Sequence, residues 1–128
     1  MMTKTEALVD AIGKLNGVWN PDSEAYAIRN PLLIRSFARP GKHETDDQGR
    51  RVFSSLMSGY KAALFDIELK IQGKSRAHLM PTNTLSDLLG VYGLEGDDEI
   101  NAIVGFLRKA LKDKKISKDT VLSYFVEG

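Results

Sequence analysis

The stretch of sequence that decides the fold is residues 46–73, which read DDQGRRVFSSLMSGYKAALFDIELKIQG. Its large apolar side chains recur at alternating steps of four and three residues, which is the a/d spacing of a heptad. The residues of this stripe are Phe53, Met57, Tyr60, Leu64, Ile67 and Ile71. The pattern predicts one long central helix over about residues 46–72, ended by Gly73. Because that helix would be roughly 40 Å long at ~1.5 Å per residue, we expect part of the stripe to contact a partner.

Shorter apolar stripes on both sides of this segment predict further helices, several of them beginning at a capping residue or at an Asn-Pro pair. The predicted helices lie at about residues 6–16, 20–29, 30–38, 84–92, 97–111 and 117–125. For residues 32–37 a buried strand is the alternative, because a short apolar run cannot be typed by its periodicity. We therefore expect an all-α fold, an irregular bundle of about five to seven helices built as one domain over residues 1–128.

The composition limits the classes of function. The chain has 128 residues, of which 42% are hydrophobic and 27% are charged, as expected for one globular domain. Its 18 Lys and Arg nearly balance 17 Asp and Glu, so no global field attracts nucleic acid or anionic lipid. Without cysteine there is no disulfide framework or thiolate nucleophile, which favours a reducing cytoplasm. We expect no membrane association, because no apolar run approaches the ~20 residues of a membrane-spanning helix.

Few residue patterns indicate catalysis or cofactor binding. The glycine-rich run at residues 90–96 is followed by carboxylates that would repel phosphate, so it is interpreted as a helix stop and turn. The acidic run at residues 95–99 does not have the spacing of a calcium loop. A second hypothesis is a metal- or carboxylate-assisted hydrolase, based only on the local density of metal-ligand side chains; an exposed loop is favoured over a site there. Those side chains are His43, Glu44, Asp46 and Asp47.

Basic residues form two clusters, one around the Arg-Pro-Gly turn at residues 39–41 and one over residues 108–118. Clustered Lys and Arg side chains are typical of contact with the phosphate backbone, although cations in the last turn of a helix also complement its dipole. The candidate contacts for an anion or nucleic acid are Arg35, Arg39, Arg108, Lys109, Lys112 and Lys115.

The leading hypothesis is a non-enzymatic, cytoplasmic helical module that binds protein, with no cofactor and no metal. We expect it to form a homodimer or to bind another protein through the heptad-like stripe of residues 53–71. The alternative function is an accessory factor that binds nucleic acid without sequence specificity through the basic clusters.

Overall fold

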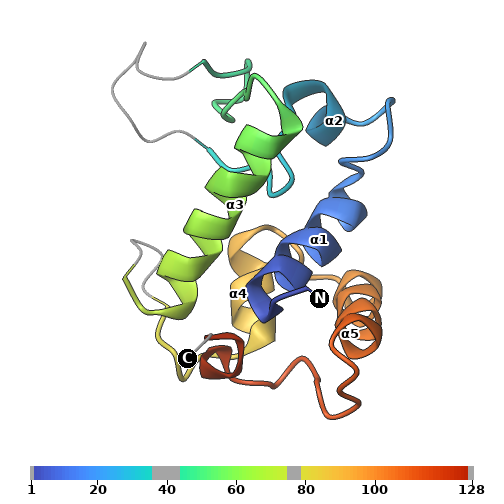
Figure 1. The fold of residues 1–128 in the computed structure, drawn as a ribbon, viewed down its shortest axis with the longest axis vertical. Coiled ribbons are helices and arrows are strands. Elements are labelled where there is room, and N and C mark those ends of the chain that lie inside the picture. The colour runs from blue at the N-terminus through green and yellow to red at the C-terminus, as the bar shows by residue number, and fades with distance from the viewer. Residues whose placement is uncertain (1, 36–43, 75–78, 127–128) are drawn as a thin grey trace.

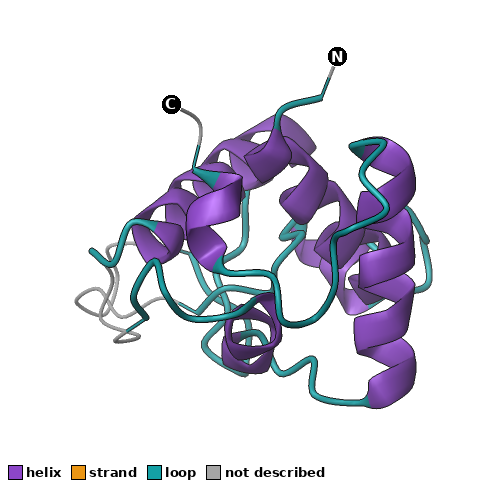
Figure 2. Ribbon diagram, turned by 90° about the horizontal axis from the view of Figure 1, so that it is seen from below, coloured by secondary structure: helices purple, strands orange, loops and turns teal. Residues whose placement is uncertain are grey.

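The computed structural model describes residues 2–35, 44–74 and 79–126, and within these ranges the chain forms helices joined by loops and turns, with no strands (Figures 1 and 2). The predicted all-α fold is therefore confirmed. The elements are α1 (Lys4–Asn16), α2 (Glu24–Ile28), α3 (Leu56–Ile71), α4 (Leu85–Val91), α5 (Asp97–Ala110) and the 3₁₀ turn η1 (Leu122–Phe125). None of the described helices is both long and apolar enough to cross a membrane.

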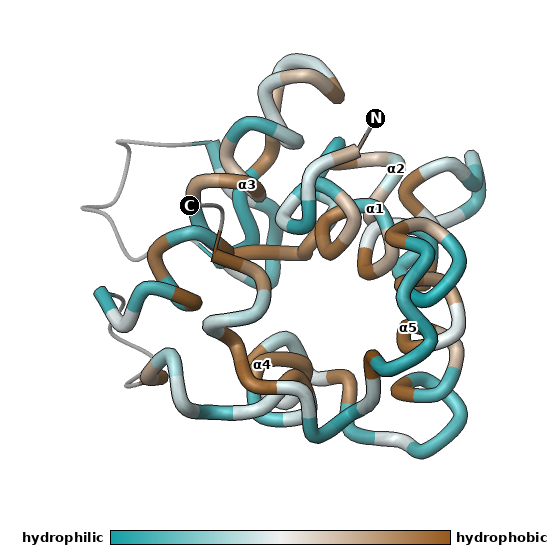
Figure 3. The backbone as a smooth tube through the Cα atoms, turned by 60° about the horizontal axis from the view of Figure 1, so that its bottom comes forward, coloured by the Kyte–Doolittle hydropathy of each residue, from teal (hydrophilic) through white to brown (hydrophobic). Residues whose placement is uncertain are grey.

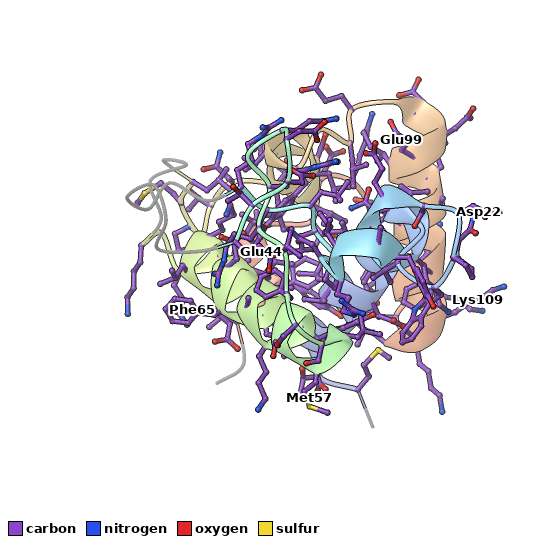
Figure 4. All side chains as sticks on the ribbon, turned by 90° about the horizontal axis from the view of Figure 1, so that it is seen from above. Asp22, Glu44, Met57, Phe65, Glu99 and Lys109 are labelled. Atoms are coloured by element: carbon purple, nitrogen blue, oxygen red, sulfur yellow. The ribbon has the colours of Figure 1, made fainter. Side chains whose placement is uncertain are left out.

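Helix α1 lies between the two longest other helices, with α3 on one side and α5 on the other (Figures 1 and 4). Leu8 and Ile12 of α1 are fully buried, as are Ile67 of α3, Leu107 of α5 and Phe125 of η1. Along α5, hydrophobic and hydrophilic residues alternate at helical spacing, so one face is available to the core and the other to solvent (Figure 3). The three helices thus share one core with η1.

The long helix is shorter than the sequence predicted, because it begins at Leu56 and not near Asp46. Its N-cap is Ser55, whose side chain accepts a hydrogen bond from the Ser58 amide. Upstream, the Asp46 carboxylate accepts hydrogen bonds from the backbone amides of Gln48 and Arg50. This side-chain-to-backbone turn competes with a helix and replaces its first part.

Two other predicted helices are also wrong. Residues 30–35 form turns that end in an isolated bridge between Arg35 and Arg50, so neither the helix nor the alternative strand forms in the described part of 30–38. In the last predicted helix only the turn Leu122–Phe125 is helical. The preceding residues instead pair with the start of α4, where the amide of Leu85 donates to the Thr120 carbonyl at 2.8 Å.

Candidate functional site: a groove between α1 and α3

An open groove with a volume of about 640 Å³ runs between α1 and the first half of α3. This volume is within the range of about 300–1,000 Å³ that is typical of binding sites. We call it the α1/α3 groove. Its lining residues are Met2, Glu6, Asp10, Trp19, Leu56, Met57, Tyr60, Lys61 and Leu64.

The α1/α3 groove is unusual for the size of its exposed apolar side chains. Met57 is 67% exposed and Trp19 is 55% exposed, although both are large and apolar. Figure 4 shows Met57 pointing away from the body of the protein at the start of α3. Isolated exposed apolar residues are ordinary on protein surfaces, but neighbouring ones around a hollow are typical of an interaction site.

The position of Trp19 follows from the end of α1. Gly17 caps that helix in the left-handed conformation, with φ of 82°, which turns the chain back toward α3. The Ser23 hydroxyl donates a hydrogen bond to the Gly17 carbonyl and holds the turn. Trp19 then lies beside Tyr60 of α3, with 6.2 Å between the ring centroids. Two aromatic rings from distant parts of the sequence therefore form one end of the groove.

The floor of the groove contains a polar pair that joins α1 to α3. The Tyr60 hydroxyl donates to Asp10 Oδ1 at 3.2 Å. Burial and the negative charge of Asp10 raise the pKa of Tyr60 to about 12. Tyr60 is therefore neutral under ordinary conditions and acts as a hydrogen-bond donor.

The raised pKa of Tyr60 predicts a change in stability at alkaline pH. The pKa of Tyr60 is higher in the folded protein than the value of about 10 in an unfolded chain. The contribution of neutral Tyr60 to the free energy of unfolding is therefore complete below pH 10. It is lost as the pH rises from 10 through 12. Phenolate absorbance is titrated against pH in the wild type and in a Tyr60→Phe variant. The difference between the two curves reports the ionisation of Tyr60 and should have its midpoint near pH 12. A midpoint near 10 would contradict the described environment, and Tyr26→Phe, at a tyrosine 47% exposed, is the matched control.

The structure divides the predicted interface stripe into two groups. Met57, Tyr60 and Leu64 line the groove, as an interface would require. Phe53, Ile67 and Ile71 are at most 6% exposed and belong to the protein's own core, so no partner reaches them in this structure. Sequence reasoning did not connect the stripe to Met2, Glu6, Asp10 and Trp19, which come from the N-terminal part of the chain.

None of the described candidates for anion or nucleic-acid contact lines the α1/α3 groove. Arg35 lies on the α3 side of the molecule, where its guanidinium donates to the Gln48 carbonyl. Arg108 is in the last turn of α5, and its Nε donates to the Ile116 carbonyl at 2.7 Å. Figure 1 shows α5 on the opposite side of α1 from α3. The exposed lysines Lys109, Lys112 and Lys115 follow on this α5 side. Arg39 lies outside the described residues, and nucleic-acid binding by either cluster stays a prediction.

Of the candidate hydrolase residues, Asp46 has a structural role that occupies its carboxylate. Asp46 uses both carboxylate oxygens to hold the turn, and its Oδ2 accepts from Arg50 Nε at 2.8 Å. Burial raises the pKa of Asp46, but the hydrogen bonds from Arg50 and Gln48 outweigh it and lower that pKa. His43 lies outside the described residues. Among those that are described, no three His, Asp or Glu side chains are close enough to hold a metal ion.

Comparisons with protein families, with curated proteins and with solved structures found no match to this chain.

Proposed function

We propose that this protein is a cytoplasmic helical interaction module that self-associates through the α1/α3 groove. The observation that carries the proposal is the exposure of Trp19 and Met57 beside a hollow that neither fills. Trp and Met are both enriched at protein interfaces, and Trp is among the residues that contribute most of the binding energy there. A protein surface that covers both side chains would remove them from water.

The charges of the groove favour a second copy of the chain as the partner. The α1 wall carries Glu6 and Asp10, whereas the α3 wall carries Lys61. In a two-fold dimer each patch meets the same patch of the other copy, so residue i contacts j and j contacts i. When the two-fold axis is parallel to the groove, the α1 wall of each copy faces the α3 wall of the other, which brings Lys61 of each copy toward the acidic wall of its partner. The groove is thus complementary in charge to itself.

The shape of the groove supports the same arrangement. Met57 projects from the rim of the hollow that it lines, and its flexible thioether adapts to irregular space. In a face-to-face dimer Met57 of each copy enters the hollow of the other. Fully burying a methionine side chain contributes about 1.5–3 kcal/mol, and the dimer buries two of them.

Replacing Met57 with glutamate is expected to weaken self-association at least tenfold, because a carboxylate would have to enter a largely apolar hollow that already carries Glu6 and Asp10. Trp19 is the only tryptophan in the sequence, so its fluorescence reports on the groove directly. Wild-type emission should move to longer wavelength on dilution from high micromolar concentration, as the indole becomes exposed to water. In Met57→Glu the emission should stay at the long wavelength throughout.

The matched control is Phe65→Glu. Phe65 is also on α3 and is 63% exposed, but it does not line the groove (Figure 4). This variant should show the same dependence on concentration as the wild type. Equal effects of the two substitutions would place the interface elsewhere on α3, and an emission wavelength independent of concentration in the wild type would refute the proposal.

A further inference from the structure

A second cavity, which shares no lining residue with the α1/α3 groove, lies between the C-terminal half of α3 and the turns on either side of residues 36–43. Its volume is about 450 Å³, large enough for a small organic molecule. We call it the Lys70 cavity. Its lining residues are Leu32, Leu33, Ile34, Arg35, Gln48, Arg50, Asp66, Lys70, Val91, Tyr92 and Gly93.

The Lys70 cavity contains two deeply buried cations. Lys70 is 8% exposed and Arg50 is 7% exposed, which is rare for these residue types unless the charge is paired. Lys70 Nζ lies 2.5 Å from Asp66 Oδ2, and Arg50 binds Asp46 and Glu24 at 2.8 Å each. The buried charges are therefore compensated in the absence of any ligand.

The compensating carboxylates are distributed unevenly around the cavity. Asp46 and Glu24 hold Arg50 but do not line the cavity, and Glu24 is largely exposed to solvent. The lining therefore carries the three cations Arg35, Arg50 and Lys70 and only one carboxylate, Asp66, a net charge of +2 on the side chains that face the space. Asp46 and Glu24 offset the charge of Arg50 from outside the cavity, so an anion inside would contact the cations directly and only one carboxylate.

The cations also keep hydrogen-bond donors for a ligand. Arg50 uses Nε and Nη1 in its ion pairs, and its Nη2 makes no hydrogen bond to the described residues. Among the described residues, Arg51 Nε is the one fully buried side-chain nitrogen or oxygen that lacks a hydrogen-bond partner. Because Nη2 of Arg50 also lacks a partner but is not fully buried, it remains accessible. Lys70 has three ammonium protons, of which Asp66 accepts one. The Tyr92 hydroxyl donates to the same Asp66 oxygen at 2.6 Å. Because Asp66 is shared in this way, it competes less strongly with a bound anion for Lys70.

The rest of the lining is apolar. Leu32 and Ile34 come from the turn after α2, and Val91 and the ring of Tyr92 come from the end of α4. We propose that the Lys70 cavity binds a small organic oxyanion, a carboxylate or phosphate ester whose charged end meets Arg50, Lys70 and Arg35 and whose apolar body meets these side chains. Charge-assisted hydrogen bonds to planar guanidinium groups are well suited to such oxyanions.

The test uses phenyl phosphate, with phenol as its neutral analogue and inorganic phosphate as the anion without an apolar body. Isothermal titration calorimetry of the full chain should give an affinity for phenyl phosphate at least tenfold higher than for either control compound. Backbone amide shifts of Tyr92 and Gly93 in nuclear magnetic resonance spectra should change on binding. Arg35 is exposed at the mouth of the cavity, so Arg35→Gln should fold normally and weaken binding about tenfold.

Lys70→Met should weaken binding further, and Lys61→Gln, at a lysine of the other groove, should leave it unchanged. Equal affinities for phenol and phenyl phosphate would overturn the proposal, because the cations would contribute nothing. Equal affinities for inorganic phosphate and phenyl phosphate would overturn the assignment of an organic ligand. Full affinity in Arg35→Gln would show that any bound anion lies outside the Lys70 cavity, even if Lys70→Met does not fold.

Discussion

Replacing Gly59 with alanine is expected to destabilise the protein by about 3 kcal/mol, near the upper end of the usual cost of overpacking. A Cβ atom at this position would lie 1.9 Å from the backbone oxygen of Arg29 and 3.3 Å from Cδ of Pro31. The obstacle is backbone at the left-handed cap of α2, so no change of side-chain rotamer relieves it. The first turn of α3 would have to move away from α2.

The control for this prediction is Gly105→Ala in α5, where an added Cβ meets nothing within 4 Å. Alanine is the better helix former, so this variant should gain about 0.5–1 kcal/mol. Urea unfolding followed by circular dichroism measures both changes. A Gly59→Ala variant as stable as the wild type would mean that α2 and α3 do not approach each other as described.

Replacing Asn30 with alanine is expected to cost a similar amount, also about 3 kcal/mol. Asn30 is fully buried, and its side chain makes three hydrogen bonds of 3.0 Å. Nδ2 donates to the carbonyls of Ile34 and Arg51, and Oδ1 accepts from the Ile34 amide. Each bond contributes about 1 kcal/mol, and the buried backbone groups would be left without partners.

Asn101→Ala, at an exposed position of α5, is the control for the loss of an asparagine and should change stability by less than about 0.5 kcal/mol. Chemical denaturation of both variants gives the comparison. If Asn30→Ala lost no more stability than Asn101→Ala, Asn30 would not hold the two turns together.

The elements that could be predicted from the sequence are those fixed by neighbouring residues. For α4, Thr84 and Asp87 form a capping box three residues apart, and the helix Leu85–Val91 falls within the predicted range 84–92. For α1, Gly17 caps the helix directly after its predicted last residue, 16. In each case the deciding hydrogen bonds lie within one turn of the chain.

The elements that could not be predicted are fixed by residues far apart in the sequence. Asn30 looks like a helix cap before Pro31, but its side chain binds the Arg51 carbonyl 21 residues away. Residues before η1 look helical, yet residues 118–119 form a turn and Val121 pairs with Thr84 in an isolated bridge. Local propensity does not contain these contacts, so it assigned helices to both segments.

The groove was predictable in part for the same reason. Periodicity placed Met57, Tyr60 and Leu64 on one stripe of α3 with Ile67 and Ile71. It did not indicate where the rest of the chain covers that stripe, and the structure shows α1 and η1 packed against α3. The approach of Trp19 to Tyr60 depends on the turn at Gly17 and left no pattern in the sequence.

Self-association through the α1/α3 groove is tested most directly by the mass of the protein in solution. Size-exclusion chromatography with light scattering at high micromolar concentration should give twice the 14.2 kDa of one chain for the wild type and for Phe65→Glu. Met57→Glu should give a single chain under the same conditions. A wild-type protein that stays at 14.2 kDa at this concentration would contradict the proposed self-association.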